Sequence, residues 1–197
     1  MSAVLLILSL AILVLVGGAI VTLVTGVIAY NSLIAKRNDV DNAWSQIDVQ
    51  LKRRHDLIPN LVETVKGYAT HEKSALEAVI RARQGAGNGS GQGAAAQAIA
   101  ENQLTATLGR LFALQEAYPD LKANENFRDL QEELSSTENR IGFARQHYND
   151  SVGVYRTTKE SFPTNFIANM FTFPDRSFFQ LSDQEKIAAQ TPPSVKF

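Results

Sequence analysis

The sequence predicts an all-α protein: one N-terminal transmembrane helix that continues into an antiparallel bundle of long helices with a short C-terminal helix. Three observations lead to this fold class. Residues 1–35 contain no Asp, Glu, Lys or Arg. Apolar residues recur in alternating steps of three and four over two long later stretches, which is the spacing of one helix face. Gly and Pro gather between these stretches, where a bundle needs connections.

The N-terminal segment is the element that the sequence defines best. Residues 4–29 are nearly all Leu, Ile, Val, Ala, Gly and Thr. A hydrocarbon core of roughly 30 Å requires about 20 apolar residues at about 1.5 Å rise each, so this run is long enough to span with some tilt. The alternative, a cleaved signal peptide, has basic residues first and a shorter apolar run. A retained anchor over 1–29 fits better.

The charges that follow the anchor predict its orientation. The first basic residues are Lys36 and Arg37, and the next basic residues are Lys52, Arg53 and Arg54. Cytoplasmic flanks of membrane helices carry an excess of Lys and Arg. We therefore expect a short N-terminus outside and a cytoplasmic body over residues 30–181.

The first long helix of this body is predicted from one apolar seam across seven heptads. Twelve of its fifteen positions are apolar, which is typical of a coiled coil or a long bundle helix. We expect a kink at Pro59, which lacks an N–H, and we expect Arg54 to lay its stem along the seam with its head in water. The seam is Tyr30, Leu33, Arg37, Val40, Trp44, Ile47, Leu51, Arg54, Ile58, Leu61, Val65, Tyr68, Glu72, Ala75 and Val79.

A glycine-rich stretch, GAGNGSGQG at 85–93, is predicted to end this helix as a hairpin loop. It lacks the spacing and the Lys of a phosphate-binding loop. We expect a second helix over 94–118, stopped by Pro119, and a third that Asn124 or Asn126 caps and that runs to about Glu160. The seam of the third helix is Phe127, Leu130, Leu134, Thr137, Ile141, Ala144, Tyr148, Ser151 and Tyr155.

The C-terminal part of the sequence is rich in aromatic residues, since seven of the ten Phe lie from Phe162 onward. Pro163 fits the first turn of a short helix over about 164–170, and residues 182–197 are expected to form a loose tail. Two interpretations remain open for the aromatic residues: a lid that folds back on the bundle, or a docking surface for another subunit, a partner or the membrane interface. The candidate contact residues are Phe162, Phe166, Ile167, Met170, Phe171, Phe173, Phe178 and Phe179.

No converging chemical groups are found. There is no Cys, and the net charge of −1 offers no field for nucleic acid. His55, His71 and His147 are interpreted as surface or seam-edge residues and not as ligands, and the start of an H-E-x-x-H motif at His71 lacks its second His. The sequence therefore predicts no catalytic, cofactor or metal residues, and no enzyme.

Two long blocks resemble the LemA family. The first is RNDVDNAWSQIDVQLKRRHDLIPNLVETVKGYATHEK from Arg37, and the second is YPDLKANENFRDLQEELSSTENRIGFARQHYNDSV from Tyr118. The segment FPTNFIANMFTFPDRSFF from Phe162 is also similar to that family's C-terminal pattern. The resemblance implies a bacterial inner-membrane protein with one N-terminal span. The resemblance supplies no catalytic residues. It implies a role like that of relatives associated with membrane remodelling, as in magnetosome formation, or with membrane signalling.

Three functions follow as hypotheses. The first is a membrane-anchored scaffold that self-associates through its helices and organises or shapes the membrane. The second is an adaptor for other membrane proteins such as a sensor kinase or a protease. The third is an enzyme, which would require a ligand cluster that the sequence does not offer. The expected partners are the lipid bilayer, further copies of the chain and other membrane proteins, with no nucleic acid and no cofactor.

Overall fold

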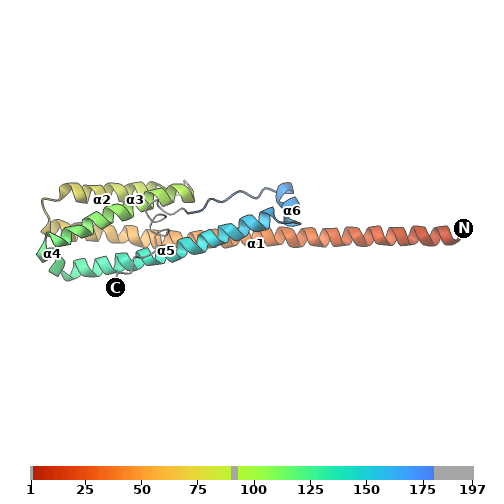
Figure 1. The fold of residues 1–197 in the computed structure, drawn as a ribbon, viewed down its shortest axis with the longest axis horizontal. Coiled ribbons are helices and arrows are strands. Elements are labelled where there is room, and N and C mark those ends of the chain that lie inside the picture. The colour runs from red at the N-terminus through yellow and green to blue at the C-terminus, as the bar shows by residue number, and fades with distance from the viewer. Residues whose placement is uncertain (1, 90–92, 180–197) are drawn as a thin grey trace, which may run out of the picture. The chain divides into compact units, whose positions relative to one another are not determined.

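A computed structural model describes residues 2–89 and 93–179, and over these ranges the chain is helical with no strand (Figure 1). The all-α prediction is therefore confirmed. The helices are α1 (Ser2–Tyr68), α2 (Lys73–Gly89), α3 (Ala94–Ala113), the short 3₁₀ helix η1 (Leu114–Glu116), α4 (Pro119–Ala123), α5 (Glu125–Glu160) and α6 (Thr164–Met170).

Internal contacts divide the chain into two compact units. Unit 1 contains residues 1–42 and 150–176, which bring the first part of α1, the last part of α5 and α6 together. Of the described residues, unit 2 contains 43–89, 93–149 and 177–179, which include the remainder of α1 and α5 with α2, α3 and α4 between them. The two long helices thus contribute one segment to each unit.

Helix α1 confirms the long apolar N-terminal helix. It begins at Ser2, it passes through Pro59 and it ends at Tyr68. The side chains of residues 5–25 are all exposed, and this part of the helix is long and apolar enough to cross a membrane.

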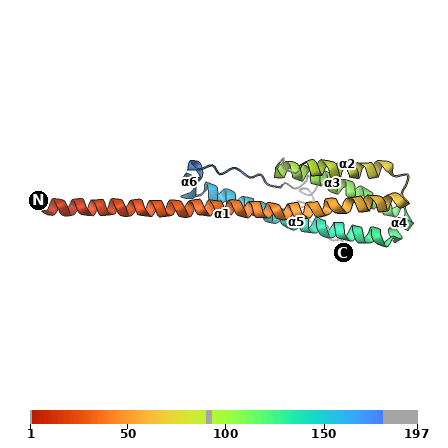
Figure 2. The same ribbon diagram turned by 180° about the vertical axis from the view of Figure 1, so that it is seen from behind.

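The predicted continuation of this helix to the glycine-rich stretch is wrong. The chain leaves α1 at Ala69, whose N–H donates to Val65 O at 2.8 Å, and α2 starts at Lys73. In unit 2, α2 and α3 then lie side by side (Figure 2). The seam residues Ala75 and Val79 therefore belong to a second helix, because the three-four spacing of two successive helices stays in phase across a four-residue turn.

Two further element boundaries differ from the prediction. Residues 85–89 of the glycine-rich stretch are the last part of α2, and 90–92 lie outside the described residues, as does the predicted tail. Pro119 does not stop a helix but occupies the first turn of α4, where its missing N–H costs nothing. The predicted cap is confirmed, since Asn124 Oδ1 accepts the N–H of Phe127 at 2.9 Å.

Burial follows the predicted seams. On α5, seven of the nine seam positions are buried, and Leu130 and Ser151 are half-buried. In unit 1 the buried apolar side chains include Ala29, Leu33, Val40, Val152, Tyr155, Ala168 and Phe173. The core of unit 2 is one cluster of Ile58, Leu61, Val62, Val65, Ala69, Leu76, Val79, Ala86, Leu104, Leu108, Leu111, Leu121, Phe127 and Leu134.

Pro59 affects the packing of unit 2 because it has no backbone N–H to donate. In an uninterrupted helix the N–H of residue 59 would bond to the carbonyl of His55. In its place, Arg83 of α2 donates its Nε–H to His55 O at 2.8 Å. This hydrogen bond attaches α2 to α1 at the one backbone position in that stretch that needs an external donor.

We expect Arg83→Met to lower the free energy of unfolding by about 1–3 kcal/mol, because the half-buried carbonyl of His55 then loses its partner. Denaturant unfolding of the full-length chain in detergent measures this difference. Arg81→Met is the matched control, because Arg81 is exposed and pairs with the exposed Glu77 in the preceding turn of the same helix. Equal effects of the two substitutions would contradict the assigned role of Arg83.

Candidate interaction surfaces

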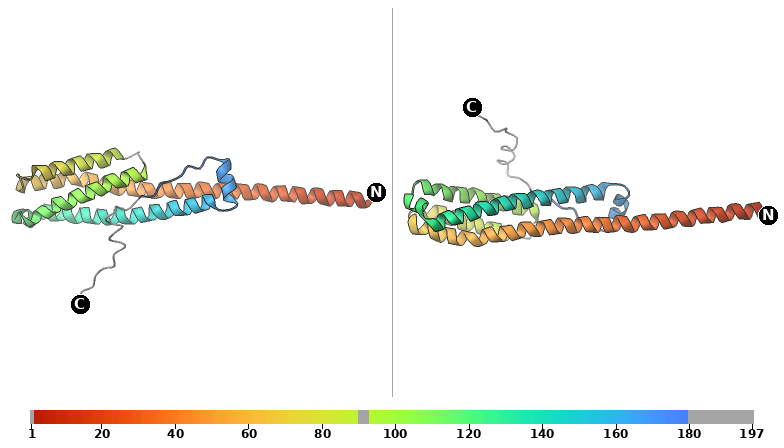
Figure 3. Two further views of the ribbon diagram at one scale, coloured as in Figure 1. Left: turned by 45° about the horizontal axis from the view of Figure 1, so that its top comes forward. Right: turned by 90° about the horizontal axis from the view of Figure 1, so that it is seen from below.

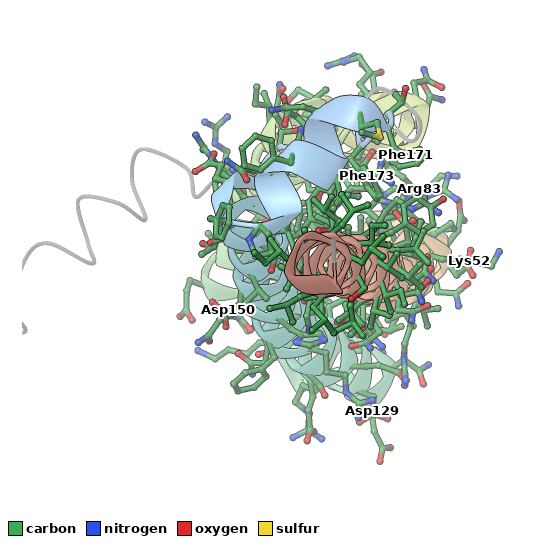
Figure 4. The ribbon with its side chains drawn as sticks, turned by 90° about the vertical axis from the view of Figure 1, so that its right-hand side faces the viewer. Lys52, Arg83, Asp129, Asp150, Phe171 and Phe173 are labelled. Carbon is green, nitrogen blue, oxygen red and sulfur yellow. The ribbon has the colours of Figure 1, made fainter. Side chains whose placement is uncertain are left out.

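Helix α6 packs on α1 within unit 1, at the end of the apolar run. A Cβ built on Gly26 would lie 3.7 Å from Cδ1 of Ile167. One turn further along α1, the ring of Tyr30 makes edge contacts with Phe171 at 5.0 Å and with Phe173 at 5.9 Å between centroids. Figure 4 shows Phe171 and Phe173 beside α6 and the first part of α1. Phe173 is buried by these contacts, with 6% of its surface exposed.

The opposite side of this short segment is apolar and exposed. Phe162 is 80% exposed, Phe166 63% and Met170 74%. Phe166 and Met170 are spaced by four on α6, so they share one face of that helix. Phe162 lies in the turn just before α6, and its ring meets that of Phe166 edge to face at 6.0 Å. Exposed apolar patches occur at protein and membrane interaction sites, so this face is kept as a candidate contact surface.

The chain that follows α6 is fastened to the rest of unit 1. Tyr155 donates its hydroxyl to Pro174 O at 3.0 Å, Lys159 pairs with Asp175 at 2.6 Å, and Arg176 pairs with Asp41 at 2.7 Å. The hydrogen bond from Lys159 holds the pKa of the Asp175 carboxyl below its ordinary value. Burial raises the pKa of the Tyr155 hydroxyl. These contacts hold the segment after α6 in one position.

The last two candidate residues lie in unit 2. Phe179 is buried at 1% exposure, with the guanidinium of Arg145 5.0 Å from its ring centroid and Trp44 at 6.1 Å. Its backbone N–H donates to Asn149 Oδ1 at 2.8 Å. Phe178, beside it, is 39% exposed. The eight aromatic and aliphatic candidates are therefore shared between the two units.

A groove between α1 and α5 in unit 2 was not anticipated from the sequence. Its volume is about 580 Å³. Phe143 protrudes at 73% exposure, Val49 is 63% exposed, and the side-chain oxygen of Gln50 is buried without a hydrogen-bond partner in the described part of the chain. The lining residues are Ser45, Gln46, Val49, Gln50, Arg140, Phe143, Ala144 and His147.

The interior of unit 2 also holds an ion-pair network. Arg54 is 2% exposed, and its Nη1 lies 2.9 Å from Glu138 Oε2 and 3.6 Å from Glu101 Oε2. Glu101, 3% exposed, also contacts His55 Nε2 at 2.9 Å and accepts from Gln97 Nε2 at 3.0 Å. The expectation that Arg54 keeps its head in water is wrong, because α3 brings a buried carboxylate to it.

None of these features forms a metal centre. Over the described residues there is no group of three or more His, Asp or Glu that could hold an ion. His55 is committed to Glu101, whereas His71 is exposed and His147 lines the groove.

Sequence reasoning missed the network and the groove for different reasons. Arg54 on an apolar seam was a signal that a buried partner exists, but nothing in the alanine-rich sequence around Glu101 identified the partner. Phe143 lies outside the seam of α5, so its exposure follows from the pattern. The hollow beside it depends on how α1 and α5 pack, which the pattern does not contain.

Fold and surfaces together define an all-α, membrane-associated helical protein, with one helix able to cross a bilayer and with apolar faces on both units. The chain belongs to the LemA family, whose model matches residues 43–197.

Three relatives show how far the similarity extends. Magnetosome protein MamQ of Magnetospirillum gryphiswaldense is 27% identical over 188 residues, covering 83% of this chain and 67% of that protein. Magnetosome protein MamQ 2 of Paramagnetospirillum magneticum is 26% identical over 187 residues, with the same coverage of both chains. Protein LemA of Metamycoplasma hominis is 26% identical over 161 residues, covering 82% of this chain and 73% of that protein.

Proposed function

We propose that this chain is a membrane-anchored helical scaffold of the bacterial inner membrane, which associates with copies of itself and organises or shapes that membrane. Its N-terminus lies outside and its body lies in the cytoplasm. The exposed apolar part of α1 supports the anchor, and the first charges, Lys36 and Arg37, support the orientation. Two relatives are named magnetosome proteins, which supports a role at a membrane.

The observation that carries the self-association is the groove around Phe143. The same patch offers a protruding ring and a hollow of about 580 Å³ beside it. A patch with both features is complementary to itself, so two copies related by a twofold axis can each place Phe143 in the groove of the other. A donor from the second copy would also satisfy the oxygen of Gln50, which has no partner among the described residues.

The membrane favours this contact further. Anchored copies share one plane and one orientation, so their effective concentration is far higher than in solution. An apolar patch of modest size is then sufficient for association.

We expect the full-length chain in mild detergent to form a discrete homo-oligomer and Phe143→Asp to reduce its particle mass with helix content unchanged. A carboxylate in the apolar contact costs about 2 kcal/mol or more, which is over tenfold in dissociation constant. Light scattering gives the mass and circular dichroism the helix content.

The matched control is Ile99→Asp, which places the same charge on an exposed apolar position of α3 (71% exposed) and should leave the mass unchanged. If Ile99→Asp lowers the particle mass and Phe143→Asp does not, the contact between copies lies on the α2–α3 face and not at the groove. A monomeric wild-type chain would overturn the self-association and favour an adaptor, whose partner crosslinking would then identify.

A further inference from the structure

We infer that the α6 segment, residues 161–174, inserts its exposed aromatic face into the interface of the bilayer, beside the transmembrane part of α1. This inference rests on the membrane anchor proposed above and deepens it, because it adds a second membrane contact on the side of the bilayer where the body lies. All the residues that carry it belong to unit 1.

The first argument is depth. Centred on residues 4–29, a hydrocarbon core of roughly 30 Å covers about 20 residues of an upright helix and therefore ends near Gly26. Ile167 of α6 contacts α1 at this residue, and Phe171 and Phe173 contact Tyr30 one turn beyond it. The segment is thus held at the level where hydrocarbon gives way to headgroups.

The second argument is composition. Residues 161–174, SFPTNFIANMFTFP, contain no charged side chain. The exposed face consists of Phe162, Phe166 and Met170. Phe is common on the apolar face of segments that lie in the plane of the membrane interface, where that face is buried at the boundary between headgroups and acyl chains. In water the same face would be an unfavourable patch.

The third argument is the position of the charges. Lys159 and Glu160 precede the uncharged segment, and Asp175 and Arg176 follow it. These four charged residues line one hollow of about 290 Å³. The surface therefore changes from apolar to charged within a few residues. The bilayer shows the same change from the hydrocarbon core to the charged headgroups.

The attachment of the segment favours a fixed insertion over a transient one. The hydroxyl of Tyr155 holds Pro174, and Asp41 holds Arg176. The backbone after the face is thus fixed to α5 and α1, and the backbone before it continues directly from the end of α5. Little conformational freedom is therefore lost when the face enters lipid. A rigid apolar wedge in only one leaflet expands that leaflet, which is a physical route to membrane curvature.

Spin labels at single cysteines test the insertion, since the chain has no native Cys. Full-length Phe166→Cys, Val14→Cys and Ile99→Cys are labelled in vesicles of phosphatidylethanolamine and phosphatidylglycerol. Collisions with oxygen, which enters lipid, and with a water-soluble nickel chelate are then compared. We expect Val14 to lose nickel access completely, Ile99 to keep it, and Phe166 to lose most of it while oxygen access rises.

The reference sites separate the possible failures. Nickel access at Phe166 equal to that at Ile99, with Val14 protected, would overturn the insertion and leave the anchor intact. Protection of Phe166 from both reagents would show that protein covers it, which also overturns the insertion. Free nickel access at Val14 would overturn the anchor and the insertion together.

Discussion

Replacing Arg54 with Met is expected to lower the free energy of unfolding by about 3–5 kcal/mol. The guanidinium faces Glu138 and Glu101 in the interior of unit 2, where Glu101 is 3% exposed. Removing the cation leaves the carboxylate of Glu101 buried, with His55 and Gln97 as its remaining polar side-chain contacts among the described residues. An uncompensated buried charge is among the largest single-residue penalties. Thermal or denaturant unfolding of the full-length chain in detergent measures it.

The adjacent residue provides the control. Arg53 also pairs with a glutamate, Glu133, but its side chain is 48% exposed and that of Glu133 is 41% exposed. Exposed pairs contribute about 0–1 kcal/mol, so Arg53→Met should be close to neutral. The double variant Arg54→Met/Glu101→Gln should recover part of the loss, because it removes the orphaned charge. A loss for Arg53→Met as large as that for Arg54→Met would contradict a special role of burial.

The second large effect is expected in the apolar core. Leu104 of α3 is fully buried in the main cluster of unit 2, and Leu104→Ala should cost about 2–5 kcal/mol through lost transfer energy and the cavity that remains. Ile99→Ala is the control, because Ile99 is an isomeric side chain on the same helix with 71% of its surface exposed. It should change stability by no more than about 0.5 kcal/mol.

The comparison is made by denaturant unfolding with both variants at one protein concentration, so that association contributes equally. Similar losses for the two residues would mean that Ile99 is covered in the protein. Helices α2 and α3, which lie side by side in Figure 3, would then carry a second contact surface. A near-neutral Leu104→Ala would mean that the core closes around the missing side chain.

The sequence predicted which residues are buried wherever one face of a helix had to be apolar. The predicted seam positions from Leu33 to Val65 are buried or half-buried, and this includes Trp44 and Arg37. The Asn124 cap was readable because a short polar side chain satisfies an otherwise unpaired N–H at a helix start. These are local rules, so they survive without knowledge of the tertiary structure.

The turn after Tyr68 was missed because no local rule marks it. Residues 69–72, Ala-Thr-His-Glu, contain neither Gly nor Pro, and the seam stays in phase across them. The glycine-rich stretch gave the opposite error, since residues 85–89 remain helical with Ala86 buried in the core. Tertiary burial there outweighs the low helix propensity of Gly.

The candidate contact residues were selected from the sequence as one set, and in the structure they are divided between the two units. Their apolar character was readable, but which of them face outward depends on contacts from α1. Tyr30 buries Phe173, and Trp44 lies against Phe179. Phe162, Phe166 and Met170 have no such cover in the described structure. A one-dimensional pattern does not contain that distinction.

The hydrogen bond from Arg83 to the carbonyl of His55 has a consequence for helix sliding. Apolar seams repeat every seven residues, so helices joined only by seams tolerate a shift of one whole heptad with modest loss. Because Pro59 lacks an N–H, the carbonyl of His55 is the one position along α1 that accepts the hydrogen bond from Arg83. The buried guanidinium of Arg54 likewise faces Glu101 and Glu138 in only one axial position of the helices. Polar contacts of this kind fix register. We therefore expect the helices of unit 2 to resist sliding past one another when a force acts along the helix axes. When α1 is displaced, α2 and α3 should move with it as one rigid body.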